Sequence, residues 1–143
     1  MCSANPLTIQ DDLAAFLSSE GVIIFSWKGE TIKEHKACIQ QVLKFRLHIL
    51  TGECAELHIF AHRSKIKYIC GGTEETTSST KSLKSLASKK RLIYPIKAVN
   101  DANKKYMFDN RYGTGQSTID AILRTTGNQN QIICFLLVLI NLP

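Results

Sequence analysis

The chain has 143 residues, 44% of them hydrophobic, which is enough for one globular domain with a buried core. Its formal net charge is +6, but the cations are dispersed and not interleaved with aromatic residues. This favours a solvated basic surface over a nucleic-acid-binding protein. The five cysteines are widely spaced without a CxxC pair, which indicates free thiols in a reducing compartment. Because there is no signal peptide and the apolar run 132–140 is too short to span a bilayer, we expect a cytoplasmic protein without a membrane partner.

The first third of the chain alternates between helix and strand patterns. Residues 11–19 have helical periodicity, and Gly21 stands where a helix would stop. Residues 22–27 are apolar, β-branched or aromatic, which predicts a buried strand. Thr31 with a glutamate three residues later forms a capping box, which predicts a helix over residues 31–44.

The same alternation continues toward the C-terminus. Residues 47–50 predict a second, short strand, and residues 55–68 and 80–90 predict helices. Residues 92–99 predict a third strand, whose Pro95 favours a strand end or a sheet edge. Strands that alternate with helices are typical of an α/β protein. We therefore expect an incomplete Rossmann-like parallel sheet with flanking helices.

A polar stretch follows the third predicted strand. Lys105 and Asp109 stand four residues apart, so they share one face of a helix, and Asn110 follows directly. Gly113 and Gly115 then predict a tight turn. A lysine, a carboxylate and an amide before a glycine turn are suited to binding a hydroxylated ligand.

A long helix is predicted after this turn, from about residue 116 to Gly127. Polar residues follow it, and then the apolar run already described. We interpret residues 128–143 as an apolar tail, a stranded remnant of a further domain or an aberrant end. An apolar strand without a sheet to join would be exposed to aggregation.

Three blocks in the same order resemble the S-adenosylhomocysteine hydrolase family. They are NPLTIQDDLAAFLSSEGVIIFSWKGET (5–31), GGTEETTSSTKSL (71–83) and FDNRYGTGQSTIDAILRTT (108–126). The resemblance implies an enzyme that cleaves S-adenosylhomocysteine to adenosine and homocysteine with bound NAD. It also implies that residues 2–110 are part of a substrate-binding domain and that residues 111–127 form a hinge helix.

The resemblance implies roles for the hydroxyl-rich segment after Gly71-Gly72. On its own, this segment is most simply a solvated polar loop. By resemblance, Glu75 holds the ribose of adenosine, and Thr76, Thr77 and Ser78 meet the ribose or nicotinamide of NAD. The family usually has threonine at the position of Ser78, so the hydroxyl is kept.

The resemblance also implies the catalytic residues. Lys105 and Asp109 would contact the 3′-hydroxyl of the ribose, with Lys105 assisting its deprotonation, and Asn110 would lie beside the nicotinamide. Without the family, Lys105 and Asp109 would be an ordinary surface pair. Glu53 would replace the second aspartate of the family's DDGGDL block, which helps to expel the 5′ group. The glycines of that block are absent and one residue is added.

Cys54, His58 and His62 recur every four residues on a predicted helix. That spacing could place three metal ligands on one face. Because no fourth ligand is evident and the family uses no such site, we interpret these residues as metal-free.

The resemblance limits what this chain does by itself. The family's dinucleotide-binding domain and its catalytic histidines have no counterpart here, so we expect the isolated chain to be inactive. The partners implied are S-adenosylhomocysteine or adenosine and a homo-oligomer or full-length subunits. The alternative is a non-catalytic fragment that associates with full-length subunits. No nucleic-acid partner is expected.

Overall fold

The computed structural model describes residues 1–127, apart from the side chains of Tyr106, Asn110 and Arg111. The predicted apolar tail 128–143 lies outside these residues. The described chain forms two units: the first is Met1–Asn100, and the second begins at Asp101. Within residues 1–127, no helix is long and apolar enough to cross a membrane.

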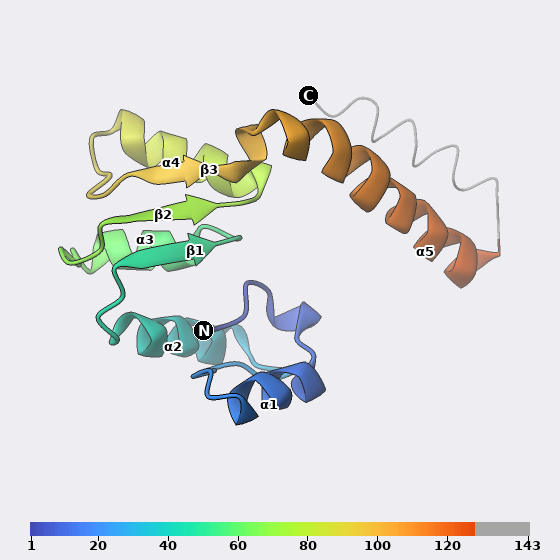
Figure 1. Ribbon diagram of the computed structural model, residues 1–143, viewed down its shortest axis with the longest axis horizontal. Helices are drawn as coiled ribbons and strands as arrows, with labels where there is room; N and C mark the ends of the chain where they lie inside the picture. The colour runs from blue at the N-terminus through green and yellow to red at the C-terminus, as the bar shows by residue number, and fades with distance from the viewer. Residues whose placement is uncertain (128–143) are drawn as a thin grey trace. The chain divides into compact units, whose positions relative to one another are not determined.

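The described part of the first unit contains a parallel sheet with the strand order β1-β2-β3 (Figure 1). These strands are β1 (Ile49–Gly52), β2 (Gly71–Glu74) and β3 (Ile96–Ala98). In the register, the last residue of β1, Gly52, pairs with the last residue of β2, Glu74. Because all three strands are parallel, their carboxyl ends lie at one edge of the sheet. The predicted α/β class with a parallel sheet is confirmed.

Helices precede, connect and follow these strands. They are η1 (Pro6–Thr8), α1 (Asp11–Ser19), α2 (Ile32–Leu43), α3 (Glu56–Arg63), α4 (Thr77–Ser88) and η2 (Val99–Asp101). The predicted bounds of α1 are confirmed, and Gly21 takes the positive φ of +89° that favours glycine after a helix. The predicted capping box is also confirmed, since the Thr31 side chain accepts from the Glu34 amide and the Glu34 carboxylate accepts from the Thr31 amide.

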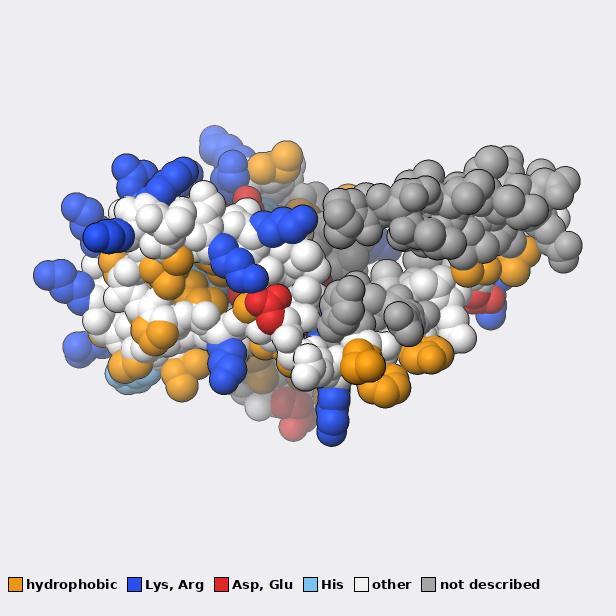
Figure 2. Space-filling model, turned by 90° about the horizontal axis from the view of Figure 1, so that it is seen from above, with side chains coloured by type: hydrophobic (Ala, Val, Ile, Leu, Met, Phe, Trp, Pro, Cys, Tyr) orange, Lys and Arg blue, Asp and Glu red, His pale blue; other side chains and the backbone are white. Residues whose placement is uncertain are grey.

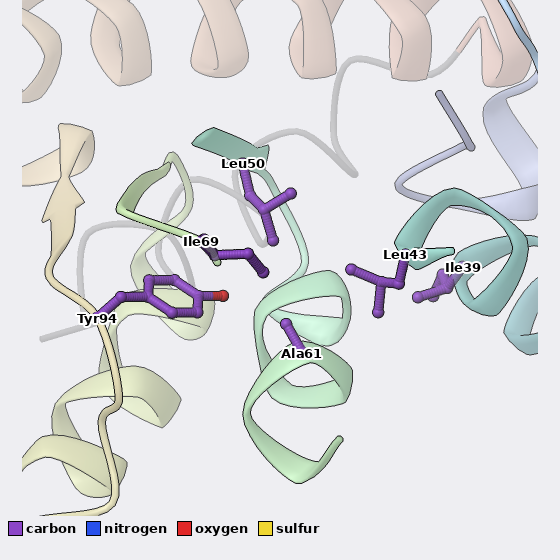
Figure 3. Close-up of a cluster of buried hydrophobic side chains, with 6 residues drawn as sticks. All are labelled: Ile39, Leu43, Leu50, Ala61, Ile69 and Tyr94. Carbon is purple, nitrogen blue, oxygen red and sulfur yellow. The ribbon is translucent and has the colours of Figure 1, made fainter. Parts of the chain in front are cut away.

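The core of the first unit lies where α2 and α3 meet the sheet and the segments that lead into it (Figure 3). Its buried side chains are Ile39, Leu43, Leu50, Ala61, Ile69 and Tyr94. Burial of these apolar side chains fixes α3 against the sheet. The turn between β1 and α3 is thereby held in place.

The prediction of a buried strand at residues 22–27 was wrong. The structure has only an isolated bridge between Cys2 and Phe25 there, with the Phe25 amide donating to the Met1 carbonyl at 2.8 Å. Ile23 is 53% exposed and Trp27 is 45% exposed. The pairing is a single bridge and forms no ladder within residues 1–127.

The central strand β2 differs from the prediction, because its sequence GGTE has no apolar residue and predicts a polar loop. The other boundaries differ by smaller amounts. β1 lies two residues later than predicted, α4 begins three residues earlier, and β3 is confined to the residues after Pro95. α3 ends at Arg63 because Lys65, with φ of +51°, turns the chain out of the helix. As predicted, Pro95 stands next to an edge strand of the described sheet.

In the second unit, the predicted glycine turn was wrong. Residues Lys105–Gly115 form a π-helical segment, η3, which continues directly into α5 (Gln116–Thr126). Gly115 is right-handed helical, with φ of −62° and ψ of −50°, since glycine permits a turn without requiring one. The Ser117 and Thr118 hydroxyls donate to the carbonyls of residues 113 and 114, both at 2.7 Å. The predicted start and end of α5 are confirmed, with Gly127 at φ of +62° after its last turn.

The four cysteines within residues 1–127 are free thiols, as predicted: Cys2, Cys38, Cys54 and Cys70. Burial raises the pKa of the Cys2 thiol to about 11. This thiol is therefore protonated at neutral pH and is a weak nucleophile.

Candidate functional site

The carboxyl ends of β1 and β2 carry the polar residues that the sequence singled out in the first unit. Glu53 directly follows β1, and Glu75 and Thr76 directly follow β2. Ligands of open α/β sheets bind in the crevice outside the carboxyl ends of the strands. The fold therefore places these residues at the edge where a ligand is expected.

Hydrogen bonds hold the two turns together. The Glu75 amide donates to the Gly52 carbonyl at 3.2 Å. The hydroxyls of Thr76 and Ser79 both lie 2.6 Å from the Glu53 carbonyl. Because the Thr76 hydroxyl is used in this way, only its lone pairs are left to accept from a ligand. The backbone of Glu53 is fixed, while its side chain stays exposed.

A cavity of about 360 Å³ lies beside these turns, and we refer to it as the carboxyl-edge cavity. Three glutamates line it: Glu53, Glu56 and Glu75. Thr77 and Ser78 are exposed in the first turn of α4. The structure therefore brings Glu53, Glu75 and Thr76 together, and it places the other two predicted hydroxyls next in the chain.

A second polar cluster, which the sequence reading missed, borders the same cavity. His35 lies between two carboxylates, with Nδ1 3.0 Å from Glu30 Oε1 and Nε2 3.2 Å from Glu56 Oε2. The Ser3 hydroxyl donates to Glu30 at 2.6 Å. Glu30 and His35 are only 6% and 4% exposed, so this part of the network is buried, while the Glu56 side chain is 42% exposed. The chain brings it together from positions too distant for a sequence motif.

Glu74 is fully buried, with an exposed fraction of 0%. Its Oε1 accepts from the Ala55 amide at 3.3 Å, while Oε2 is buried without a hydrogen bond, 3.8 Å from His58 Nε2. Burial raises the pKa of this carboxyl above its usual value, and the hydrogen bonds from Ala55, Ser79 and Glu75 oppose that rise. The period-two pattern of β2 places Gly72 and Glu74 on one face, but this pattern is informative only once GGTE is known to be a strand.

His58, also fully buried, explains why β2 has glycine at position 72. Its Nε2 lies 3.1 Å from the Thr73 carbonyl, which can only accept, so Nε2 carries the proton. Its Nδ1 then accepts from the Tyr94 hydroxyl at 3.0 Å. Burial lowers the pKa of His58, so the ring is neutral. A Cβ at Gly72 would collide with this ring.

Cys54, His58 and His62, whose spacing could suit a metal site, do not meet at one point in the structure. Cys54 lies in the turn before α3, not on its face as the spacing predicted. His62 Nδ1 donates to the His58 carbonyl at 2.7 Å, and both His58 nitrogens have protein partners. Within residues 1–127, no group of three potential metal ligands comes together.

The second unit contains the other predicted catalytic residues. Lys105 Nζ and Asp109 Oδ2 form an ion pair at 3.0 Å on one face of η3, as the four-residue spacing predicted. The Lys105 side chain is 17% exposed and that of Asp109 is 53% exposed. The side chain of Asn110 lies outside the described residues. The convergence of this pair with Glu75 stays a prediction.

Replacing Glu74 by glutamine tests whether burial of its carboxyl makes the stability of the fold depend on pH. Because its pKa is raised in the folded state, the unfolded chain loses this proton at a lower pH than the folded chain. Wild-type stability therefore falls as pH rises above about 4.5. We expect Glu74→Gln to gain stability relative to wild type between pH 4 and pH 8, by about 1.4 kcal/mol per unit of raised pKa. Urea unfolding at several pH values measures this, and an equal gain in the exposed-site control Glu20→Gln would contradict it.

An open parallel sheet with charged and hydroxyl side chains at its carboxyl edge is typical of a Rossmann-like α/β fold, in which this edge is the usual place for a ligand. The family model described as S-adenosyl-L-homocysteine hydrolase matches residues 1–59. Adenosylhomocysteinases of Sulfolobus acidocaldarius and Saccharolobus solfataricus are 46% and 47% identical over 127 and 130 residues. The S-inosyl-L-homocysteine hydrolase of Methanothermobacter thermautotrophicus is 42% identical over 129 residues. Each of these matches covers 88% of this chain.

With this similarity over most of its length, the chain belongs to the S-adenosyl-L-homocysteine hydrolase family. It spans 31% of the length of these curated relatives. The residues matched by the family model, 1–59, include every residue that lines the carboxyl-edge cavity except Glu75. The resemblance drawn from the three sequence blocks is confirmed.

Proposed function

We propose that this chain belongs to an NAD-dependent enzyme that hydrolyses S-adenosylhomocysteine to adenosine and homocysteine. The observation that carries the proposal is the meeting of Glu53 and Glu75 at one cavity, on the carboxyl edge of a sheet from this family. Both carboxylates are exposed at the cavity. Carboxylates accept hydrogen bonds strongly, and a ribose offers two neighbouring hydroxyl donors.

Glu75 is the residue that we assign to the ribose. Its amide is bound to the Gly52 carbonyl, so the backbone is fixed while the carboxylate faces solvent and the cavity. Two carboxylate oxygens can accept from two adjacent hydroxyls at once. This arrangement would orient the sugar before any bond changes.

Lys105 and Asp109 are the residues that we assign to the 3′-hydroxyl. Their ion pair at 3.0 Å holds the lysine nitrogen on one face of η3, and the Lys105 side chain is largely shielded from solvent. In its neutral form, this amine would accept the proton of the 3′-hydroxyl. Asp109 would accept a hydrogen bond from the same ligand and orient the amine.

The hydroxyl-rich turn fits the polar part of a bound cofactor. Thr77 and Ser78 present exposed hydroxyls at the start of α4, whereas Thr76 contributes only lone pairs. We assign these residues, together with Asn110, to the ribose and nicotinamide of NAD. When bound, NAD would supply the acceptor for the 3′-hydride. Glu53, fixed through its carbonyl, would serve as the carboxylate near the leaving sulfur.

A second candidate substrate is S-inosylhomocysteine, which differs in the base of the nucleoside. Some relatives are named S-inosyl-L-homocysteine hydrolase. Isothermal titration of the chain with adenosine and with inosine tests both candidates. We expect saturable binding of adenosine, with weaker binding of inosine. Tighter binding of inosine would favour the second candidate. A folded chain that binds neither nucleoside but captures an intact family member would support the non-catalytic alternative.

A further inference from the structure

The first unit has a larger cavity at the opposite ends of the helices, and we refer to it as the basic cavity. It measures about 880 Å³ and lies between α3, α4 and the segments that follow them. Four cations line it: Arg63, Lys65, Lys67 and Arg91. No carboxylate lines it, and none lies within salt-bridge distance of these four side chains in residues 1–127. The space-filling view likewise shows Lys and Arg side chains outnumbering Asp and Glu on one face of this unit (Figure 2).

Two helix ends bring these cations together. α3 ends at Arg63 and α4 ends at Ser88, and each is followed by a lysine with positive φ, Lys65 at +51° and Lys90 at +54°. The amides after these turns donate back to the helices, from Ile66 to Ala61 and from Arg91 to Leu86. The two turns therefore deliver Lys65, Lys67 and Arg91 to the same cavity.

Stabilisation of helix ends accounts for only part of this charge. Each helix C-terminus carries roughly half a negative charge, so two ends offset about one of the four positive charges. An excess of about three remains in a cavity without a carboxylate. This excess favours an anion with more than one charge.

The remaining lining has two further features. Ile59, Leu86 and Ile93 form an apolar wall. His62 also lines the cavity, is only 7% exposed, and has a buried Nε2 without a hydrogen-bond partner. Its Nδ1 donates to the His58 carbonyl, so Nε2 of the neutral ring is an acceptor for which the described chain supplies no donor. Such an unmatched buried polar atom indicates a missing partner.

We propose that the basic cavity binds a small phosphate monoester that carries an apolar body. The phosphate group carries a charge of about −1.5 to −2 near neutral pH, and its oxygens accept from the clustered cations. Its singly protonated form also has one P–OH, which can donate to the unpartnered Nε2 of His62. The apolar body would pack on Ile59, Leu86 and Ile93. The volume lies within the range of about 300–1,000 Å³ found for small-molecule sites. This site is separate from the carboxyl-edge cavity and does not depend on the function proposed for it.

Amide chemical shifts of the full 143-residue chain, titrated with phenyl phosphate, test this proposal. We expect saturable shifts confined to residues 59–67 and 82–93, with at least tenfold weaker binding of phenol and of inorganic phosphate. The double variant Lys67→Gln/Arg91→Gln should weaken binding of phenyl phosphate at least tenfold. The matched control Lys33→Gln/Lys36→Gln, which removes two exposed lysines of α2 outside the cavity, should change it less than twofold.

Four results would overturn the proposal. Shifts spread over the whole basic surface would show general charge attraction, as would equal weakening in both double variants. Tighter binding of a single-stranded oligonucleotide than of phenyl phosphate, with the same shifts, would assign the cavity to nucleic acid. Absence of any saturable shift in the folded wild-type chain would show that the cavity does not bind this class of ligand.

Discussion

Replacing Gly72 by alanine should destabilise the first unit by about 3 kcal/mol. A Cβ at this position would collide with Cε1 of the fully buried His58 and would lie 2.8 Å from the Leu50 carbonyl oxygen. Neither neighbour can move easily, because His58 is hydrogen-bonded at both nitrogens and Leu50 belongs to the adjacent strand. Urea unfolding followed by circular dichroism measures the loss.

The adjacent residue Gly71 provides a matched control in the same strand. A Cβ there would meet the Pro95 carbonyl oxygen at 3.4 Å, which is ordinary contact. We expect Gly71→Ala to change stability by less than about 0.5 kcal/mol. Equal effects of the two substitutions would show that β2 is not packed against α3 as described.

Replacing Glu75 by glutamine should weaken adenosine binding by about 30- to 100-fold. The proposed carboxylate accepts from two ribose hydroxyls, and hydrogen bonds to a charged group contribute about 1.5–3 kcal/mol each. The substitution keeps the shape of the side chain but removes the charge and turns one acceptor into a donor. Because Glu75 is exposed, we expect the fold to be unaffected. Isothermal titration with adenosine measures the change in affinity.

Glu20→Gln is the control for this substitution, since Glu20 is an exposed glutamate at the end of α1 and does not line the carboxyl-edge cavity. We expect it to leave the affinity within twofold of wild type. If Glu75→Gln also leaves the affinity within twofold, Glu75 does not bind the ribose. Circular dichroism of both variants confirms that the fold is intact.

The parts of the fold that local chemistry determines could be predicted from the sequence. The bounds of α1, the capping box at Thr31 and the end of α5 before Gly127 all depend on residues within one helical turn. β2 could not be predicted in this way, because its Gly72 is explained by His58 from another element. The glycines of η3 predicted a turn that the structure does not have. Glycine permits a turn, but no neighbouring residue requires one there.

The residues of the candidate site also fall into two groups, those that the sequence predicted and those that only the structure shows. Glu75 and Thr76 lie within a recognisable block of sequence, and Glu53 was assigned by its position after the second predicted strand. The structure places these three residues together. The pairing of Lys105 with Asp109 followed from helical spacing. Glu74 and the cluster around His35 could not be predicted, because their partners come from distant positions and burial decides their behaviour.

The affinity ratio between adenosine and 3′-deoxyadenosine is the most direct test of whether Glu75, Lys105 and Asp109 act on one ribose. If they do, the wild-type chain should bind adenosine 10- to 100-fold more tightly, because the 3′-hydroxyl meets a charged pair. The ratio should fall to near one in Lys105→Met, while Glu75→Gln should weaken both nucleosides. A ratio near one in the wild-type chain, or one that Lys105→Met leaves unchanged, would contradict the shared site.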